Sequence, residues 1–177
     1  MKTGEKQSAG SEPTQRKSIR LPGFDYAANG CYFVTICTQN RIHVFGEIAD
    51  GALRGRPGGP HEMAERWMQE LERRFPDIRL GPHIVMPNHV HMLLERIGDN
   101  AGDHTGSPLR EIVGWFKTMT TNDYIRHVKN GEYAPFPGRL WQRNYYEHII
   151  RNDLDYLQTA EYIENNPARW EEDREYS

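Results

Sequence analysis

The chain has 177 residues, of which 37% are hydrophobic and 27% are charged, and its formal net charge is −3. This length fits one domain with a substantial core, and no apolar run approaches the roughly 20 residues of a membrane-spanning helix. The N-terminus lacks the apolar segment of a secretory signal. The two cysteines, Cys31 and Cys37, lie too far apart in one predicted strand to bond to each other. We therefore expect a cytoplasmic protein with reduced thiols.

Both ends of the chain are expected to be peripheral. Residues 1–15 mix charged residues with Gly, Ser and Thr without periodicity, which predicts a flexible segment. Residues 171–177 form an acidic tail, and residues 16–170 are predicted to form a single domain. The tail can hide a basic surface from the net charge, although charged termini that are simply solvated explain the same composition.

The first half of the domain contains one strong strand signal and one strong helix signal. Residues 31–38 are rich in β-branched and aromatic side chains, which predicts a central strand, and residues 44–48 predict a short extended piece. Residues 51–60 are rich in Gly, Pro and Arg and predict a loop. Apolar residues at every fourth position then predict a helix over 62–75.

The second half begins with a predicted hairpin and ends with a predicted helix. Extended segments at 78–80 and 83–85 lead through a Pro87–Asn88 turn into a strand that starts at His89. The later predicted elements are a helix over 109–128, opened by Ser107 and Pro108, an extended segment over 140–146, and a helix over 153–166 capped by Asn152 or Asp153. We expect the core side of the first of these helices to carry Leu109, Ile112, Val113, Phe116 and Ile125.

This order of elements predicts an α+β fold. Strand–helix–strand–strand–helix–strand–helix is typical of a ferredoxin-like or RRM-like antiparallel sheet with helices packed on it.

Two histidines mark the predicted hairpin as a candidate metal site. His89 and His91 are two residues apart on a strand, so both imidazoles project from one face and can bind a divalent metal ion. A single strand histidine is more often a hydrogen-bonded structural residue. The pair therefore needs a third ligand and a reacting group from elsewhere in the chain.

The last predicted helix supplies candidates for both. At about 100° per residue, Tyr156, Ala160 and Ile163 share a core face with Leu157 beside them, whereas Tyr162 and Asn166 fall together on roughly the opposite side. Asn166 could supply a carbonyl oxygen one turn from the Tyr162 phenol. Two imidazoles and an amide oxygen suit Mn²⁺ or Mg²⁺ better than a structural zinc ion. Tyr145 and Tyr146 are rival nucleophiles, although an extended aromatic pair usually serves packing.

Several separated motifs resemble one family. His89-Val90-His91 after the Met86-Pro87-Asn88 turn resembles the His-hydrophobic-His motif of HUH nucleases. The segment from Tyr162 to Asn166 is similar to the Tyr-x-x-x-Gln/Asn element of their single-tyrosine transposases. The segments that look like the REP-associated tyrosine transposase branch of this IS200-like family are 16–26, 32–40, 141–151 and 162–167.

The resemblance implies the HUH endonuclease fold and a metal-dependent transposase that cleaves and rejoins single-stranded DNA. It implies that Tyr162 attacks a phosphodiester and forms a 5′-phosphotyrosine, while His89, His91 and Asn166 hold the divalent metal, Mg²⁺ or Mn²⁺. The implied partner is single-stranded or hairpin DNA of the REP type, bound by a nucleoid-associated bacterial protein. Some relatives exchange the tyrosine helix between two chains, so monomer and homodimer both stay open.

The DNA contacts are predicted from charge and aromaticity. The candidates for phosphate contacts are Arg16, Lys17, Arg20, Lys117, Arg139 and Arg143, and Trp141 is a candidate for stacking on unpaired bases. Two alternatives stay open at this point: a domesticated protein that binds hairpin DNA without cleaving it, and a structural metal-binding domain unrelated to DNA.

Overall fold

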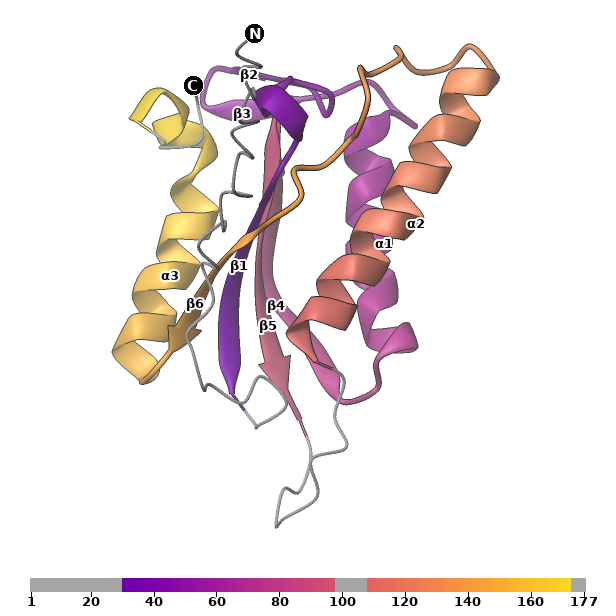
Figure 1. The fold of residues 1–177 in the computed structure, drawn as a ribbon. Helices are drawn as coiled ribbons and strands as arrows, with labels where there is room; N and C mark the ends of the chain where they lie inside the picture. Colours follow the sequence, from indigo (N-terminus) through magenta and orange to yellow (C-terminus); the bar gives the residue numbers. More distant parts are fainter. Residues whose placement is uncertain (1–29, 98–107, 173–177) are drawn as a thin grey trace, which may run out of the picture.

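A four-stranded antiparallel sheet forms the centre of the molecule (Figure 1). The structure is a computed structural model that describes residues 30–97 and 108–172. In spatial order the strands are β4 (Ile78–Met86), β5 (His89–Arg96), β1 (Cys31–Cys37) and β6 (Tyr146–Ile150). This order and the helical connections are those of the ferredoxin-like fold, so the predicted fold class is confirmed.

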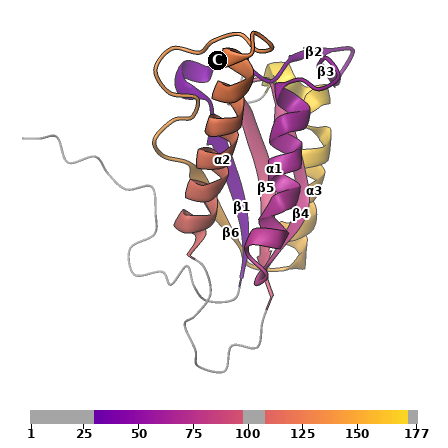
Figure 2. The same cartoon turned by 90° about the vertical axis from the view of Figure 1, so that its right-hand side faces the viewer.

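Helices cover both faces of the sheet. The α-helices of the described residues are α1 (Pro60–Arg74), α2 (Leu109–Lys129) and α3 (Asp153–Asn165). Helices α1 and α2 pack together on one face, and α3 lies alone on the other (Figures 1 and 2). The smaller elements are η1 (Gln39–Arg41), β2 (Glu47–Ala49), β3 (Ala52–Arg54) and η2 (Pro167–Glu172).

Strand alternation divides the core between the two faces. On β1 and β5 the residues Val34, Ile36, Val90 and Met92 point toward α1 and α2 and belong to the larger cluster. Phe33 and Leu93 point the other way and pack with Ile163 of α3. The face that carries α3 is therefore less apolar, which leaves room there for polar side chains.

The predicted loop at 51–60 was wrong in its first residues. Residues 52–54 form β3, which pairs with β2 through a tight turn at Asp50 and Gly51. Both turn residues have left-handed backbone conformations, with φ of 53° and 70°. An Asp-Gly pair is the usual sequence of such a hairpin turn, so the signal was present but was outweighed by the Gly and Pro residues that follow.

The extended segment predicted at 140–146 was also wrong, because the strand begins where that segment ends. Leu140, Trp141 and Tyr145 are buried in the core, and their apolar character reflects this packing. The Lys117 ammonium group donates hydrogen bonds to the backbone carbonyls of Gln142 and Asn144, at 2.9 and 3.0 Å. These contacts fix the segment in an irregular conformation before β6 starts.

Two apolar helix residues lie on the surface rather than in the core as predicted. Ile125 is exposed, because Asp123 and Tyr124 occupy the buried side of α2 there. The buried Asp123 carboxylate accepts hydrogen bonds from Trp67 Nε1 and Arg66 at 2.8 and 3.0 Å, which turns this side of α2 toward α1. Leu157 of α3 is 64% exposed.

Helix α3 approaches the sheet closely where β4 has a glycine. A Cβ atom on Gly81 would lie 3.2 Å from Leu93 Cβ and 3.3 Å from the Tyr156 hydroxyl. That hydroxyl donates a hydrogen bond to Glu95 Oε1 at 2.9 Å. Partial burial and this carboxylate raise the pKa of Tyr156 to about 12, so the phenol stays protonated and keeps donating. Tyr156 is thus a packing residue, as predicted.

The sequence also gave rise to predictions for the cysteines, the start of α3 and the ends of the chain. Cys31 and Cys37 are both free thiols. Asn152 caps α3, since its side-chain oxygen accepts a hydrogen bond from the backbone N–H of Asp155. Residues 1–15, Ser107 and residues 173–177 lie outside the described residues. Within the described ranges, no helix is long and apolar enough to cross a bilayer.

We expect Gly81→Val to lower the free energy of unfolding by about 1–3 kcal/mol, because its methyl groups would push α3 away from β4. Gly114 is the matched control. It lies in the middle of α2, and a Cβ atom there would meet nothing within 4 Å. Gly114→Ala should therefore raise the free energy of unfolding by about 0.5–1 kcal/mol. Urea denaturation measures both, and an unchanged Gly81→Val variant would contradict the close approach of α3.

Candidate active site

His89 and His91 face each other from β5, on the side of the sheet that α3 covers. Both side chains are buried, and their Nε2 atoms are 2.9 Å apart. The ring centroids are separated by 4.4 Å. The prediction that both imidazoles project from one strand face is confirmed.

The outer nitrogen of each imidazole has a partner that fixes the ring. His89 Nδ1 lies 2.8 Å from Asn88 Oδ1, and His91 Nδ1 lies 2.8 Å from Thr35 Oγ1. An amide oxygen only accepts, so His89 Nδ1 carries the hydrogen and the lone pair of its Nε2 is directed at His91 Nε2, 2.9 Å away. The Thr35 hydroxyl can accept as well as donate, so His91 can present its Nε2 lone pair in the same way. Such outer partners orient metal-binding histidines.

The turn before His89 is held in place by the segment after β1. The backbone carbonyl of Asn88 accepts from Thr38 N–H at 2.8 Å, and that of Pro87 accepts from Phe45 N–H at 3.1 Å. In the same segment Asn40 and Arg41 have φ of 55° and 53°. Two consecutive left-handed residues that are not glycine are uncommon, and such strain is concentrated at functional sites.

His89 is held in its neutral form. Burial, with a smaller contribution from the positive charge of Arg41, lowers the pKa of His89 to about 3. A neutral imidazole is the form that binds a metal ion. The positive charge of Arg41 therefore lies near the histidines and favours the neutral form of His89.

Tyr162 lies against His91. Their ring centroids are 5.3 Å apart, and the Tyr162 ring meets Phe33 edge to face at 6.0 Å. The residue is 38% exposed, so solvent reaches part of it. The expectation that Tyr162 and Asn166 point away from the core side of α3 was wrong in one respect: Tyr162 contacts the sheet through Phe33 and His91, and Asn166 is buried. The reason is that α3 packs along the flank of the histidines.

Asn166 lies at the C-terminal end of α3, as the cap residue of that helix. Its side chain is 2% exposed, and within the described residues its Oδ1 has no hydrogen-bond partner. The chain on both sides of it contacts the imidazoles: Tyr162 packs on His91, and the Trp170 ring stacks on His89 at 6.0 Å and 23°. A buried amide oxygen without a partner costs free energy, which a bound cation would offset.

These donors fit a divalent metal ion. In the described part of the chain, no cluster of three or more His, Cys, Asp or Glu residues could hold one. A site here must therefore use His89 Nε2, His91 Nε2 and an oxygen from a different residue type. Asn166 Oδ1 is such an oxygen, and this mixed set is compatible with Mn²⁺ or Mg²⁺.

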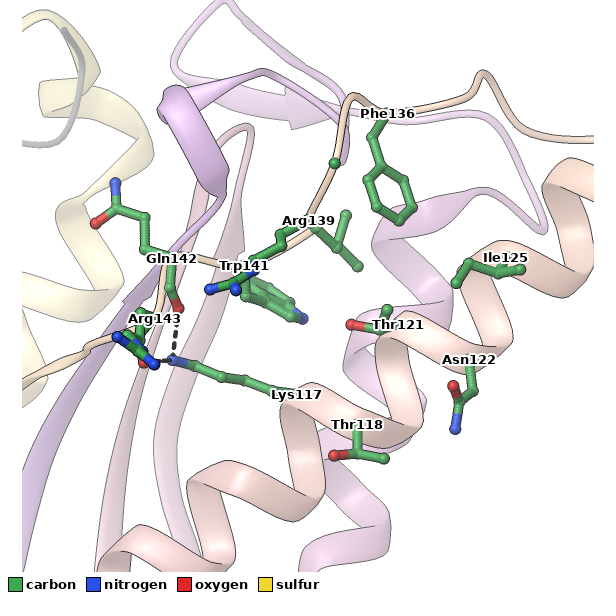
Figure 3. Close-up of a pocket in the computed structure, with 12 residues that line it drawn as sticks. Lys117, Thr118, Thr121, Asn122, Ile125, Phe136, Arg139, Trp141, Gln142 and Arg143 are labelled. Atoms are coloured by element: carbon green, nitrogen blue, oxygen red, sulfur yellow. Dashed lines mark hydrogen bonds between the residues drawn. The ribbon is translucent and has the colours of Figure 1, made fainter.

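Three of the predicted DNA-binding residues surround one pocket on the opposite face of the sheet. Lys117, Arg139 and Arg143 line a cavity of about 400 Å³ between α2 and residues 136–143 (Figure 3). Trp141 also borders it but is 4% exposed, because its ring packs on Phe45 and Phe116 in the core. A Trp141 ring buried in this way has no free face on which an unpaired base could stack. Arg16, Lys17 and Arg20 lie outside the described residues.

The rival tyrosines occupy different environments. Tyr145 is buried with the Lys117 ammonium group 5.5 Å from its ring centroid, which is a packing role. Tyr146 is 54% exposed on the edge strand β6, on the same side of the sheet as Tyr162. Neither has an asparagine one helical turn away.

Sequence reasoning missed the residues that support the histidines. Asn88, Arg41, Thr35 and Trp170 all contact or influence them. Asn88 directly precedes His89, and its position in the turn could have suggested a hydrogen bond. Thr35 depends on the register that places it opposite His91, and nothing in the local sequence predicts that pairing.

Comparison with known proteins decides the family. A model described as "Transposase IS200 like" matches residues 29–166. The chain belongs to the IS200-like transposase family. The matched range contains both histidines, Tyr162 and Asn166, so the IS200-like region includes the whole candidate site.

Individual relatives agree with this family and with the REP-associated branch. A Haemophilus influenzae protein of uncharacterised function is 36% identical over 176 residues, which cover 91% of this chain and 93% of the relative. A second protein from that organism, provisionally named REP-associated tyrosine transposase, is 25% identical and aligns over 82% of this chain and 74% of its own length. A solved REP-associated tyrosine transposase bound to a REP hairpin is 20% identical, with a TM-score of 0.55, covering 90% of this chain and 74% of that one. The last likeness shows the HUH fold.

We expect Thr35→Val to leave the His91 ring without a fixed orientation. Valine keeps the branched shape of threonine but leaves the buried His91 Nδ1 without its hydrogen-bond partner. The unsatisfied nitrogen should cost about 1–3 kcal/mol of the free energy of unfolding, only partly offset by the added methyl group. Thr35→Ser keeps the hydroxyl and serves as the control. Nitrogen NMR of the His91 ring reports its tautomer, and an identical spectrum in Thr35→Val would show that the hydroxyl does not select it.

Proposed function

We propose that this IS200-like transposase cleaves and rejoins single-stranded DNA, with Tyr162 as the nucleophile. The observation that carries the proposal is the contact of the Tyr162 ring with His91, together with a buried, unpartnered Asn166 oxygen one helical turn later. A tyrosine whose only role was packing would need neither the histidine pair nor the asparagine.

The reaction follows from the chemistry of a phenol. Tyr162 Oη attacks the scissile phosphorus, the bond from phosphorus to the 3′ oxygen breaks, and the phenol proton is given up as the 3′ oxygen becomes a hydroxyl. The products are a 5′-phosphotyrosine and a free 3′-hydroxyl, and the reverse attack by a 3′-hydroxyl rejoins the strand. At neutral pH only about one phenol in a thousand is ionised at its ordinary pKa near 10, so the reaction needs assistance at the phosphate.

His89, His91 and Asn166 are the residues that would hold a divalent ion. When bound, such an ion withdraws charge from the phosphate and orients the reacting groups. Asn88 and Thr35 orient the two rings so that their Nε2 atoms face each other. The low pKa of His89 keeps its ring neutral, so that Nε2 has a lone pair for a metal ion. Arg41 adds a positive charge near His89. In the structure Tyr162 and both histidines approach one another within a single chain.

We further propose that the substrate carries a hairpin, as in REP-type repeats. The solved relative is bound to a REP hairpin, and one curated relative bears the name of that branch. Arg139 and Arg143 are exposed around the pocket of Figure 3 and are suited to contact phosphates, while Lys117 braces the segment that carries them. From the sequence, Arg16, Lys17 and Arg20 remain candidates for further phosphate contacts.

Tyr162→Phe should abolish cleavage and the covalent protein–DNA adduct while hairpin binding persists. The change removes one oxygen and keeps the ring that packs on Phe33 and His91, so the fold should not change. The assay traps the adduct on labelled single-stranded hairpin DNA and maps it by mass spectrometry. A nucleotide on Tyr145 or Tyr146 would show that the nucleophile is another tyrosine. Binding without an adduct in the unmodified protein would favour a DNA-binding protein that no longer cleaves.

Asn166→Ala should weaken Mn²⁺ binding by about tenfold or more, since one of three protein ligands is lost. The neighbouring Asn165→Ala is the matched control, because Asn165 ends α3 with its side chain exposed. Calorimetry or electron paramagnetic resonance of Mn²⁺ measures the affinity without reference to cleavage. Equal affinity in the two variants would exclude Asn166 as a ligand, and unchanged binding in a His89→Ala, His91→Ala double variant would exclude the site.

A further inference from the structure

A second groove opens directly beside Tyr162, between α3 and β6. It has a volume of about 320 Å³, at the lower end of the range for small-ligand pockets. We call it the α3–β6 groove. Tyr162 lies at one end, and Asp155 lies seven residues earlier on the same helix stripe, about 10 Å along the axis. The groove thus includes the proposed nucleophile, Tyr162, but its lining contains neither His89 nor His91.

The walls of the α3–β6 groove are aromatic. Phe33 comes from β1, Tyr146 from β6 and Tyr162 from α3, and the Phe33 ring meets both tyrosines edge to face, at 6.4 and 6.0 Å. Tyr146 is the unusual member, because a large aromatic residue that is 54% exposed has not been placed there by core packing. An exposed aromatic ring is a surface on which an unpaired base can stack.

Polar groups face the same groove from α3. Gln158 and Thr159 line it, and in the described part of the chain neither side chain makes a hydrogen bond. An amide both donates and accepts, which suits the edge of a nucleobase. His148 and Asp155 bond each other at 3.1 Å, and the backbone N–H of Arg151 also donates to that carboxylate.

The charge of the groove selects a base over a phosphate. Among the residues that the structure describes, none that lines it is Lys or Arg, and the Asp155 carboxylate is negative. The backbone N–H of Arg151 and the His148 ring hold the pKa of Asp155 below its usual range, so it stays ionised. A phosphate would be repelled here, whereas a neutral aromatic ring would not. The basic residues Arg139 and Arg143 lie instead on the opposite face, only a few residues before Tyr146.

We propose that the α3–β6 groove binds one unpaired base of the cleaved strand, next to the scissile phosphate, stacked on Tyr146 and contacted at its edge by Gln158. This inference rests on the proposed function, since the base belongs to the strand that Tyr162 attacks. It makes Tyr146 a substrate-positioning residue and gives the α3–β6 groove a part in choosing the cleavage site.

The first test uses fluorescence in a Tyr162→Phe background, so that no strand is cut. Hairpins carry 2-aminopurine at each single-stranded flanking position in turn. Quenching on binding is expected at one position, lost in Tyr146→Ala and retained in Tyr146→Phe, which keeps the ring. Leu157→Ala is the control on the same helix, because Leu157 is exposed and lies outside the groove. Quenching at no position, or equal quenching in Tyr146→Ala, would overturn the proposal.

The second test uses cleavage rates and an abasic nucleotide at the quenched position. Removing the base should slow the unmodified protein by roughly 5- to 150-fold, the value of one stacked base. Tyr146→Ala should slow cleavage of the intact strand to a similar extent and show little further loss on the abasic strand. Losses that multiply would overturn the proposal, because they would mean that ring and base act separately. If the unmodified protein does not cleave, the fluorescence result still decides the groove, and cleavage without quenching would remove the groove but not the proposed function.

Discussion

The antiparallel pairing of β1 with β5 is the constraint on which the site depends. Its register sets Thr35 opposite His91 and Cys37 opposite His89, so one face of two central strands carries the imidazoles and the hydroxyl that orients one of them. A shift of one residue would turn both histidines into the apolar core of the other face. The apolar residues Val34, Ile36, Val90 and Met92, which alternate with these polar ones, make such a shift costly.

Helix α3 converts this sheet face into a candidate active site. Contacts along its whole length hold it: Tyr156 bonds Glu95, Ile163 enters the small apolar cluster, and Trp170 beyond its end stacks on His89. The cluster around Ile163 is much smaller than the core beneath α1 and α2. Packing alone therefore specifies α3 weakly, and hydrogen bonds and aromatic contacts contribute more to its position. The same contacts place Tyr162 against His91 and bury Asn166 at the end of the helix.

Local periodicity predicted the fold class, the hairpin with the histidines, and the spacing of Tyr162 and Asn166. It could not predict which residues meet across the sheet, so Thr35, Arg41 and Trp170 were missed. Apolar residues misled where packing and secondary structure differ. Leu140, Trp141 and Tyr145 are buried without forming a strand, and Leu157 is exposed although Tyr156 and Ala160 pack against the small cluster around Ile163. The face of Tyr162 was misjudged because a helix on a polar sheet face buries polar residues as well as apolar ones.

A net charge of −3 does not conflict with DNA binding if charge and aromaticity are separated in space. The pocket between α2 and residues 136–143 gathers cations, whereas the α3–β6 groove has a carboxylate and three aromatic rings. The segment from Arg143 to Tyr146 joins the two regions around the β6 edge of the sheet. A strand that follows this edge would have its phosphates attracted on one face and a base held on the other. On the proposal that Tyr162 attacks this strand, the Asp155 carboxylate would keep the phosphates out of the α3–β6 groove and leave it to a base.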